Sequence, residues 1–92
     1  MFVFYPVHDP QPGKEDLWVQ KMRHFDEVIK KLPGVLFVSD IFPDPAKGTL
    51  TGFTFCESED AWKAVWPVLV QEAPAGEGEV NPPEVFLFHS AA

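Results

Sequence analysis

The sequence predicts an α+β domain of the βαββαβ type, with two helices on one face of an antiparallel sheet, and three observations lead to it. Short β-favouring runs alternate twice with stretches of helical period. Turns containing proline and glycine separate these elements. A β-α-β unit that occurs twice is the signature of the split βαβ, or ferredoxin-like, sheet. All 92 residues are expected to form this single domain, residues 1–92.

The first strand and the first helix have clear boundaries. Apolar, β-favouring residues fill positions 1–7 and predict a strand. A helix is predicted from about Glu15 to Leu32, with acidic residues in its first turn and lysines in its last, which suits the helix dipole. Pro33 and Gly34 end it. Its apolar stripe has helical spacing and consists of Trp18, Met22, Phe25, Ile29 and Leu32.

The second half of the chain repeats this order. Residues 35–42 and 49–56 are predicted to be strands joined as a hairpin by the turn at 43–48. Ser58 is expected to cap a second helix, in which Pro67 would cause a kink or a restart. The proline- and glutamate-rich residues 72–84 predict a mobile surface loop, and residues 85–89 a last strand.

Composition excludes several classes of protein. The net charge is −7, so the chain has no basic face for nucleic acid. One cysteine excludes an internal disulfide framework and a zinc site built from several thiolates. No apolar run reaches the roughly 20 residues of a membrane span, and the N-terminus does not resemble a signal peptide. A soluble, cytoplasmic protein with no membrane partner is expected.

The strands indicate that the sheet is covered on both faces. A face exposed to water would carry polar side chains at alternate positions, whereas both alternating sets are apolar here. In the first strand they are Phe2 and Phe4 against Val3, Tyr5 and Val7, and in the last strand Val85 and Leu87 against Phe86 and Phe88. Because two helices cover one face, the sequence predicts a homodimer packed through the other.

Several side chains are candidates for a ligand pocket. Trp62 and Trp66 could line a flat pocket for an aromatic or quinone-like ligand, or serve as core or dimer contacts. Trp18 would shape the same pocket from the first helix. Tyr5 could orient a ligand with its hydroxyl or lie at the dimer interface. His24, beside the apolar stripe, is the candidate general base, with a solvated boundary histidine as the alternative.

The other reactive residue types point less directly to a site. His8 and Asp9 stand at the exit of the first strand, where loops often present functional groups, but adjacent residues of a strand point to opposite sides. His89 ends the last strand and is interpreted as a chain-end residue. The histidines lack the spacing of a metal site, so no metal is expected. Cys56 is expected to be a buried structural thiol.

Two junctions resemble the dimeric α/β-barrel superfamily, and within it the antibiotic biosynthesis monooxygenases. The residues that carry the resemblance are Leu32-Pro33-Gly34-Val35 and Phe55-Cys56-Glu57-Ser58-Glu59-Asp60-Ala61. Oxygenase-type members often carry a tryptophan before the second junction's serine and a histidine about seven residues after it. This chain has Cys56 and Val65 there. The resemblance therefore does not bring the usual catalytic pair into this chain.

The resemblance implies two alternatives for function. One is a small homodimeric protein that binds an apolar or aromatic molecule between sheet and helices, with a monooxygenase-like or proton-transfer reaction that needs no cofactor. His24 would then be the base, and Tyr5, Trp18, Trp62 and Trp66 would shape the pocket. The other is a module for dimerisation or ligand sensing that performs no catalysis.

Overall fold

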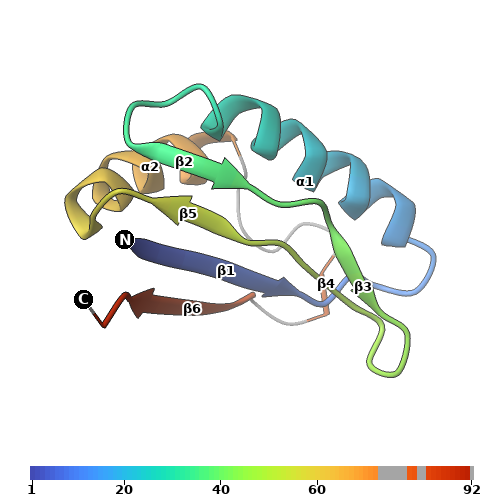
Figure 1. The fold of residues 1–92 in the computed structure, drawn as a ribbon. Helices are drawn as coiled ribbons and strands as arrows, with labels where there is room; N and C mark the ends of the chain where they lie inside the picture. Colours follow the sequence, from blue (N-terminus) through green and yellow to red (C-terminus); the bar gives the residue numbers. More distant parts are fainter. Residues whose placement is uncertain (73–78, 81–82, 92) are drawn as a thin grey trace.

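The computed structural model describes residues 1–72, 79–80 and 83–91 and has an α+β fold (Figure 1). Two helices and six strands occur in this part of the chain. In order they are β1 (Phe2–His8), α1 (Glu15–Ile29), β2 (Val35–Val38), β3 (Phe42–Asp44), β4 (Thr49–Thr51), β5 (Thr54–Cys56), α2 (Glu59–Glu72) and β6 (Glu84–His89).

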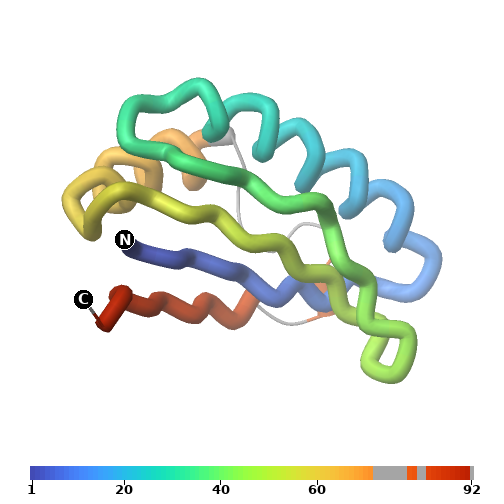
Figure 2. The backbone as a smooth tube through the Cα atoms, viewed as in Figure 1, coloured from blue at the N-terminus to red at the C-terminus, as the bar shows by residue number. Residues whose placement is uncertain are grey.

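One antiparallel sheet contains all six strands, and β1 is central in it. β6 pairs with one edge of β1, while β5 and β4 pair in turn with the other edge. β2 then pairs with β5, and β3 with β4. Figure 2 shows that β2 and β3 follow one bent path, as do β4 and β5. Counting each path as one strand produces the ferredoxin-like order, so the predicted fold class is confirmed.

The structure divides the predicted strand 49–56 into β4 and β5. The predicted strand 35–42 ends at Val38, and β3 begins at Phe42 and continues into the predicted turn at 43–48, so the turn is shorter than expected. The reason for the break is local. Backbone pairing continues where the N–H of Ser39 donates to the carbonyl of Phe53 at 2.8 Å. In return, the N–H of Phe53 donates to the hydroxyl of Ser39 at 2.7 Å, not to a backbone carbonyl. A side chain thus replaces one bond of the ladder, which bends both strands at this point.

The first helix is shorter than predicted, and the second begins where its predicted cap placed it. α1 ends at Ile29, three residues before Leu32, although Leu32 still packs against the core. Ser58 caps α2 as predicted, because its Oγ accepts a bond from the N–H of Ala61 at 3.2 Å. α2 continues through Pro67 as one helix, so the predicted restart does not occur.

The core lies between the sheet and the helices as two clusters. One cluster joins α2 to β1 and β5, and the ring of Trp62 stacks on that of Phe4 with centroids 4.1 Å apart. The other cluster joins α1 to Leu50 of β4. The buried members are Phe2, Phe4, Ile29, Cys56, Trp62 and Val65 in the first, and Trp18, Met22, Phe25 and Leu50 in the second.

Neither of the two described helices lies on the opposite face of the sheet (Figure 1). Tyr5 lies at the centre of an aromatic group there and stacks on Phe86 at 4.8 Å and on Phe88 at 5.8 Å between ring centroids. Phe37 is 58% exposed and Phe88 49%. We call this group the outer aromatic surface; it consists of Tyr5, Phe37, Phe42, Phe53, Phe55, Phe86 and Phe88.

The predicted mobile loop at 72–84 falls largely outside the described residues, which lack 73–78 and 81–82. Within that stretch, Glu79 is buried and forms an isolated bridge with Pro10. Among the described helices, none has the length and the apolar character that crossing a membrane requires.

Candidate functional site

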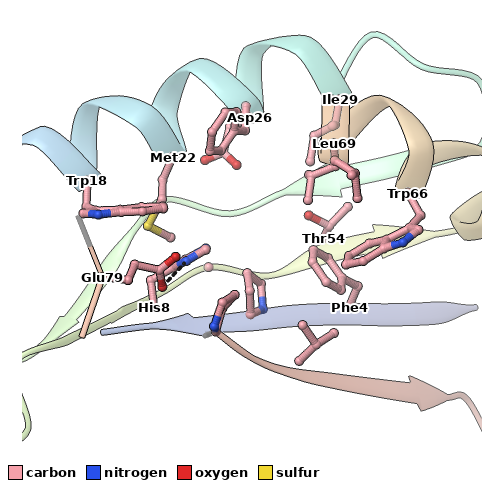
Figure 3. A pocket seen from close by; sticks show the side chains of 16 residues that line it. Phe4, His8, Trp18, Met22, Asp26, Ile29, Thr54, Trp66, Leu69 and Glu79 are labelled. Atoms are coloured by element: carbon pink, nitrogen blue, oxygen red, sulfur yellow. Dashed lines mark hydrogen bonds and ion pairs between the residues drawn. The ribbon is translucent and has the colours of Figure 1, made fainter. Parts of the chain in front are cut away.

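A pocket of about 140 Å³ lies between α1, α2 and the sheet (Figure 3). Most of its lining is apolar, and aromatic rings come from both helices and from β1. The apolar lining residues are Phe4, Pro6, Trp18, Met22, Phe25, Ile29, Trp66, Leu69, Val70, Pro83 and Val85, and the remainder are Gly52, Thr54, His8, Asp26 and Glu79. Such walls suit an apolar ligand, while a few polar groups fix its orientation.

The wall near the end of β1 is built around His8. Its imidazole stacks on the indole of Trp18, with centroids 4.8 Å apart and planes 25° from parallel. The indole Nε1 of Trp18 is sealed from solvent and has no hydrogen-bond partner among the described residues. Trp18 therefore serves the pocket as a flat apolar support for the histidine ring and not as a donor to a ligand.

His8 is paired with Glu79 across the pocket wall. Its Nδ1 lies 3.2 Å from Oε2 of Glu79, and this pair is drawn as a dashed line in Figure 3. The Glu79 side chain is 1% exposed and that of His8 is 13% exposed. The carboxylate thus lies behind the imidazole, and the imidazole is the member of the pair that a ligand can reach.

Two backbone contacts hold Glu79 in place beside the end of β1. The N–H of Val80 donates to the carbonyl of Asp9 at 2.8 Å. The side chain of Gln11 donates from Nε2 to the carbonyl of Glu79 at 3.3 Å. Residues 79–80 are therefore attached to the segment that follows β1, which explains how a residue 71 positions away reaches His8.

Burial lowers the pKa of His8 below its usual value of 6.5, although the charge and the hydrogen bond of Glu79 oppose the effect. The imidazole is therefore neutral near pH 7. An ionised carboxylate can only accept hydrogen bonds, so Nδ1 carries the proton and donates it to Glu79. Nε2 is then the nitrogen with a free lone pair, and it can accept a proton.

Asp26 is the acidic group on the opposite wall. It extends from α1 toward the pocket in Figure 3. Burial raises the pKa of its carboxyl to about 6, and the negative charges of Asp40 and Glu27 raise it further against the opposing charge of Lys30. A shifted carboxyl in a cleft is typical of functional sites, although it occurs elsewhere too.

The structure brings together two of the five residues that the sequence singled out. Trp18 and Trp66 line the pocket. Trp62 is 6% exposed and packs in the core, outside the pocket lining. Tyr5 belongs to the outer aromatic surface on the other face of the sheet. His24 is exposed on α1 and does not line the pocket.

Three pocket residues were not assigned to a site from sequence. His8 had one usable signal, its place at the end of the first strand. Asp26 follows Phe25 of the apolar stripe, so its position beside a buried residue was also readable. Glu79 had no signal, because its pairing with His8 is a contact between residues 71 positions apart.

Outside the pocket, Nε2 of His89 lies 3.3 Å from Oε2 of Glu59 at the exposed surface, so His89 is paired and is more than a chain-end residue. In the described part of the chain, no three His, Cys, Asp or Glu side chains lie close enough together to hold a metal ion. Cys56 is fully buried, and burial raises the pKa of its thiol. A protonated, inaccessible thiol is a poor nucleophile, so Cys56 has a structural role as expected.

No protein-family model matches the chain, and no curated relative matches it. The fold is nevertheless close to that of solved structures. Rv0793 from Mycobacterium tuberculosis is 16% identical, with a TM-score of 0.86 over 99% of this chain and 95% of that chain. A Deinococcus radiodurans protein provisionally assigned as an antibiotic biosynthesis monooxygenase is 11% identical, with a TM-score of 0.84 over 100% of this chain and 94% of that chain.

A third similar structure is a mutant of MhuD with two manganese protoporphyrin IX molecules bound per active site. It is 16% identical, with a TM-score of 0.77 over 100% of this chain and 96% of that chain. At these identities the likeness concerns the fold alone. The resemblance in fold to the antibiotic biosynthesis monooxygenases, expected from the sequence, is confirmed.

Proposed function

We propose that the chain binds a small aromatic molecule in the pocket between α1, α2 and the sheet, and that His8 takes a proton from it. The observation that carries the proposal is the His8–Glu79 pair. A neutral imidazole faces an apolar pocket, and a buried carboxylate lies 3.2 Å behind it. Burying a carboxylate costs free energy unless it has a partner, and His8 is the partner of Glu79.

The size of the pocket limits the ligand to about one ring. A cavity of roughly 150 Å³ lined by apolar side chains can take up benzene. This pocket measures about 140 Å³. Phe4 and Trp66 pack edge to face on each other, with ring centroids 6.3 Å apart, and both rings line the pocket as aromatic surface for a ligand ring.

In the proposed proton transfer, Nε2 of His8 accepts the hydrogen of a ligand hydroxyl, and the electron pair of the O–H bond stays on oxygen. The imidazolium that forms donates from Nδ1 to Glu79, whose negative charge stabilises it. His8 is thus the catalytic residue, and Glu79 is a positioning residue that also selects the tautomer. This step is the one that a cofactor-independent, monooxygenase-like reaction needs first, because it makes the substrate electron-rich.

A porphyrin does not fit this pocket. The volume of about 140 Å³ is that of a single ring. The lining also contains no lysine or arginine among the described residues, so the carboxylates of a porphyrin would have no cation to pair with. We therefore propose a function without haem, and without another bound cofactor, despite the fold shared with MhuD.

We also propose that the protein is a cytoplasmic homodimer joined through the outer aromatic surface. Phe37, Phe42 and Phe88 are each about half exposed there. A continuous apolar area of this kind marks an interaction site on small proteins. An identical copy is a suitable cover, because a two-fold axis would place the same apolar surface of each subunit against that of the other.

A second candidate function is ligand sensing or dimerisation without catalysis. The outer aromatic surface favours it, since this surface needs a partner whether or not the pocket turns over a substrate. In that case His8 would only orient the ligand. The two candidates differ in what His8 does after binding.

Binding of phenol and toluene tests the proposal, because the two molecules have nearly the same size. We expect the indole N–H resonances of Trp18 and Trp66 to shift with both ligands. Phenol should bind about tenfold more tightly, because its hydroxyl can donate to Nε2 of His8. His8→Phe retains a ring that can stack on Trp18 and should remove the preference. Equal affinities in the wild type would contradict the role of His8, and absence of any shift would contradict the site.

A further inference from the structure

We infer that the ligand of this pocket is an organic cation, a single aromatic ring that carries an ammonium group, and that Asp26 is the residue that selects it. The inference rests on the proposed function, because it assigns a chemical class to the ligand of the same pocket. It concerns the wall opposite His8 and does not depend on the proton transfer.

The charges of the pocket favour a cation. Its acidic lining residues are Asp26 and Glu79, its imidazole is neutral near pH 7, and no lysine or arginine lines it among the described residues. A carboxylate or phosphate ligand would therefore meet negative charge without a cation to offset it. An ammonium group would meet attraction, and the net charge of −7 adds to that attraction at longer range.

Among the described residues, Asp26 forms no ion pair. The charge of Lys30 on α1 acts on its carboxylate, but the ammonium of Lys30 lies 2.6 Å from Oε1 of Glu27. Asp40, from the segment between β2 and β3, and Glu27 repel the carboxylate, while burial removes water from it. These three effects explain why the pKa of Asp26 is raised to about 6. An ammonium group in the pocket would supply the missing charge.

Glu79 does not compete for the same cation. Its side chain is 1% exposed and its Oε2 lies 3.2 Å from Nδ1 of His8, so this carboxylate already has a partner. Asp26 is only partly buried and lines the pocket directly. The two acidic residues therefore have different roles. Glu79 orients His8, whereas the carboxylate of Asp26 is the charged group that a ligand contacts.

The aromatic walls add to the preference for a cation. The faces of tryptophan and phenylalanine rings carry partial negative charge and attract ammonium groups, above all where water is excluded. Trp66, Phe4 and Phe25 contribute such rings to the lining, while the ring of Trp18 is already stacked on His8 and has the ammonium of Lys21 5.0 Å from its centroid. A ligand ring can pack against Phe4 and Trp66 at one end, while its ammonium group approaches Asp26 at the other (Figure 3).

Benzylamine, benzyl alcohol and benzoate test the inference at pH 7.5, since each carries one ring and a small group of different charge. We expect benzylamine to bind roughly tenfold more tightly than benzyl alcohol and benzoate to bind weakest. The indole resonances of Trp18 and Trp66, with the backbone resonance of Asp26, report binding at this pocket. Equal affinity for the amine and the alcohol, or tighter binding of benzoate, would overturn the inference and leave the proposed pocket intact.

Two variants with the same change of charge locate the effect. Asp26→Asn should bring the ratio of the two affinities close to one. Glu15→Gln removes a charge from the same helix at an exposed position outside the pocket, so the ratio should remain near ten. A ratio that falls equally in both variants would mean that general charge, not Asp26, attracts the amine, and would overturn the assignment. If none of the three probes shifts these resonances, the proposed function itself fails.

Discussion

Nδ1 of His8 lies 3.2 Å from Oε2 of Glu79, and the two residues are 71 positions apart in the chain. The contact joins the end of β1 to a residue that lies before β6 in the chain. It also determines which nitrogen of His8 faces the ligand, because the carboxylate binds the other. The proton transfer proposed for His8 therefore depends on this pair.

The first prediction concerns the ionisation of His8. Glu79 raises the pKa of His8, and burial lowers it by more. Glu79→Gln removes the charge but retains a hydrogen-bond acceptor and the same volume, so the pKa of His8 should fall further. Titration of the imidazole protons by NMR measures this change. An unchanged or higher pKa in the variant would mean that the pair does not form in solution.

The same shift has a consequence for stability. Folded His8 binds fewer protons than unfolded His8, because its pKa is lower in the folded state. Stability should therefore decline as the pH falls through the unfolded value of about 6.5 toward the folded value. Urea unfolding between pH 7.5 and 5 should show a steeper decline for the wild type than for His8→Phe, which has no group to titrate at this position. Parallel curves would contradict the prediction.

Asp26 is expected to destabilise the fold at neutral pH. Its pKa is about 6 in the folded protein, against an ordinary value of 3.8. The folded state thus binds more protons between these values, and stability is lost as the pH rises through about 6. Asp26→Asn should raise the free energy of unfolding at pH 7.5 by about 1 kcal/mol, after allowance for the solvent around a partly buried carboxylate.

Denaturant unfolding measures this gain, and it should shrink as the pH falls from 7.5 to 5. Glu27→Gln is the matched control, because Glu27 is exposed and pairs with Lys30 at the surface. That variant should change stability little, since such surface pairs contribute little. A loss of stability in Asp26→Asn at pH 7.5 would show that the carboxylate has a stabilising partner.

Gly34 is predicted to be the most sensitive glycine of the described residues. It has a φ of +84°, and a Cβ there would lie 2.6 Å from the Cβ of Ala61 on α2. Gly13 also has a φ of +84°, but nothing lies within 4 Å of its added Cβ. Gly13→Ala should therefore cost about 1–2 kcal/mol for the backbone alone. Gly34→Ala should cost about 1–3 kcal/mol more, because α2 must also move.

Thermal or urea unfolding of the two glycine variants gives the comparison directly. Equal losses would mean that α2 adjusts to the added methyl group at no cost. Gly34 lies in the turn between α1 and β2, and Ala61 lies on α2. The Gly34 variant therefore also tests how closely this turn packs against α2.

The outer aromatic surface is predicted to control the oligomeric state. Phe37 is 58% exposed on it, and Phe37→Glu would bring two negative charges into a two-fold interface. The variant should be a monomer at concentrations at which the wild type is a dimer, as measured by light scattering after gel filtration. Leu17→Glu is the control, because Leu17 is 40% exposed on α1, which covers the other face of the sheet. A monomeric wild type would contradict the proposed dimer.

Local patterns in the sequence were sufficient for most of the fold. The stripe from Trp18 to Ile29 has the helical period, and in the structure these residues are buried on α1 as expected. Ser58 caps α2 because a serine hydroxyl at that position satisfies a free backbone N–H. The bends at Ser39 and Phe53 were not readable, because they depend on a hydroxyl that replaces a backbone acceptor in a neighbouring strand.

Some residues of the candidate site could likewise be indicated from the sequence, and others only from the structure. Trp18 and Trp66 could be selected from sequence, because large aromatic residues on apolar helix faces point toward the sheet, whichever fold they belong to. From the sequence, His24 was preferred to His8 because it flanks the apolar stripe of the first helix, yet His8 is the histidine that lines the pocket. Burial, the stacking on Trp18 and the pairing with Glu79 distinguish His8, and all three are properties of the folded chain.

The sequence by itself determined the order of the elements, the amphipathic helices and the apolar character of both sheet faces. These properties follow from periodicity and turn residues, which act over a few positions of the chain. Only the tertiary structure decided which polar groups share a pocket. His8, Asp26 and Glu79 come from a strand, a helix and a segment before the last strand, and the closing of the sheet and helices around the core brings them together. Burial then shifts the pKa values of His8 and Asp26, because it removes the water that would otherwise stabilise their charged forms.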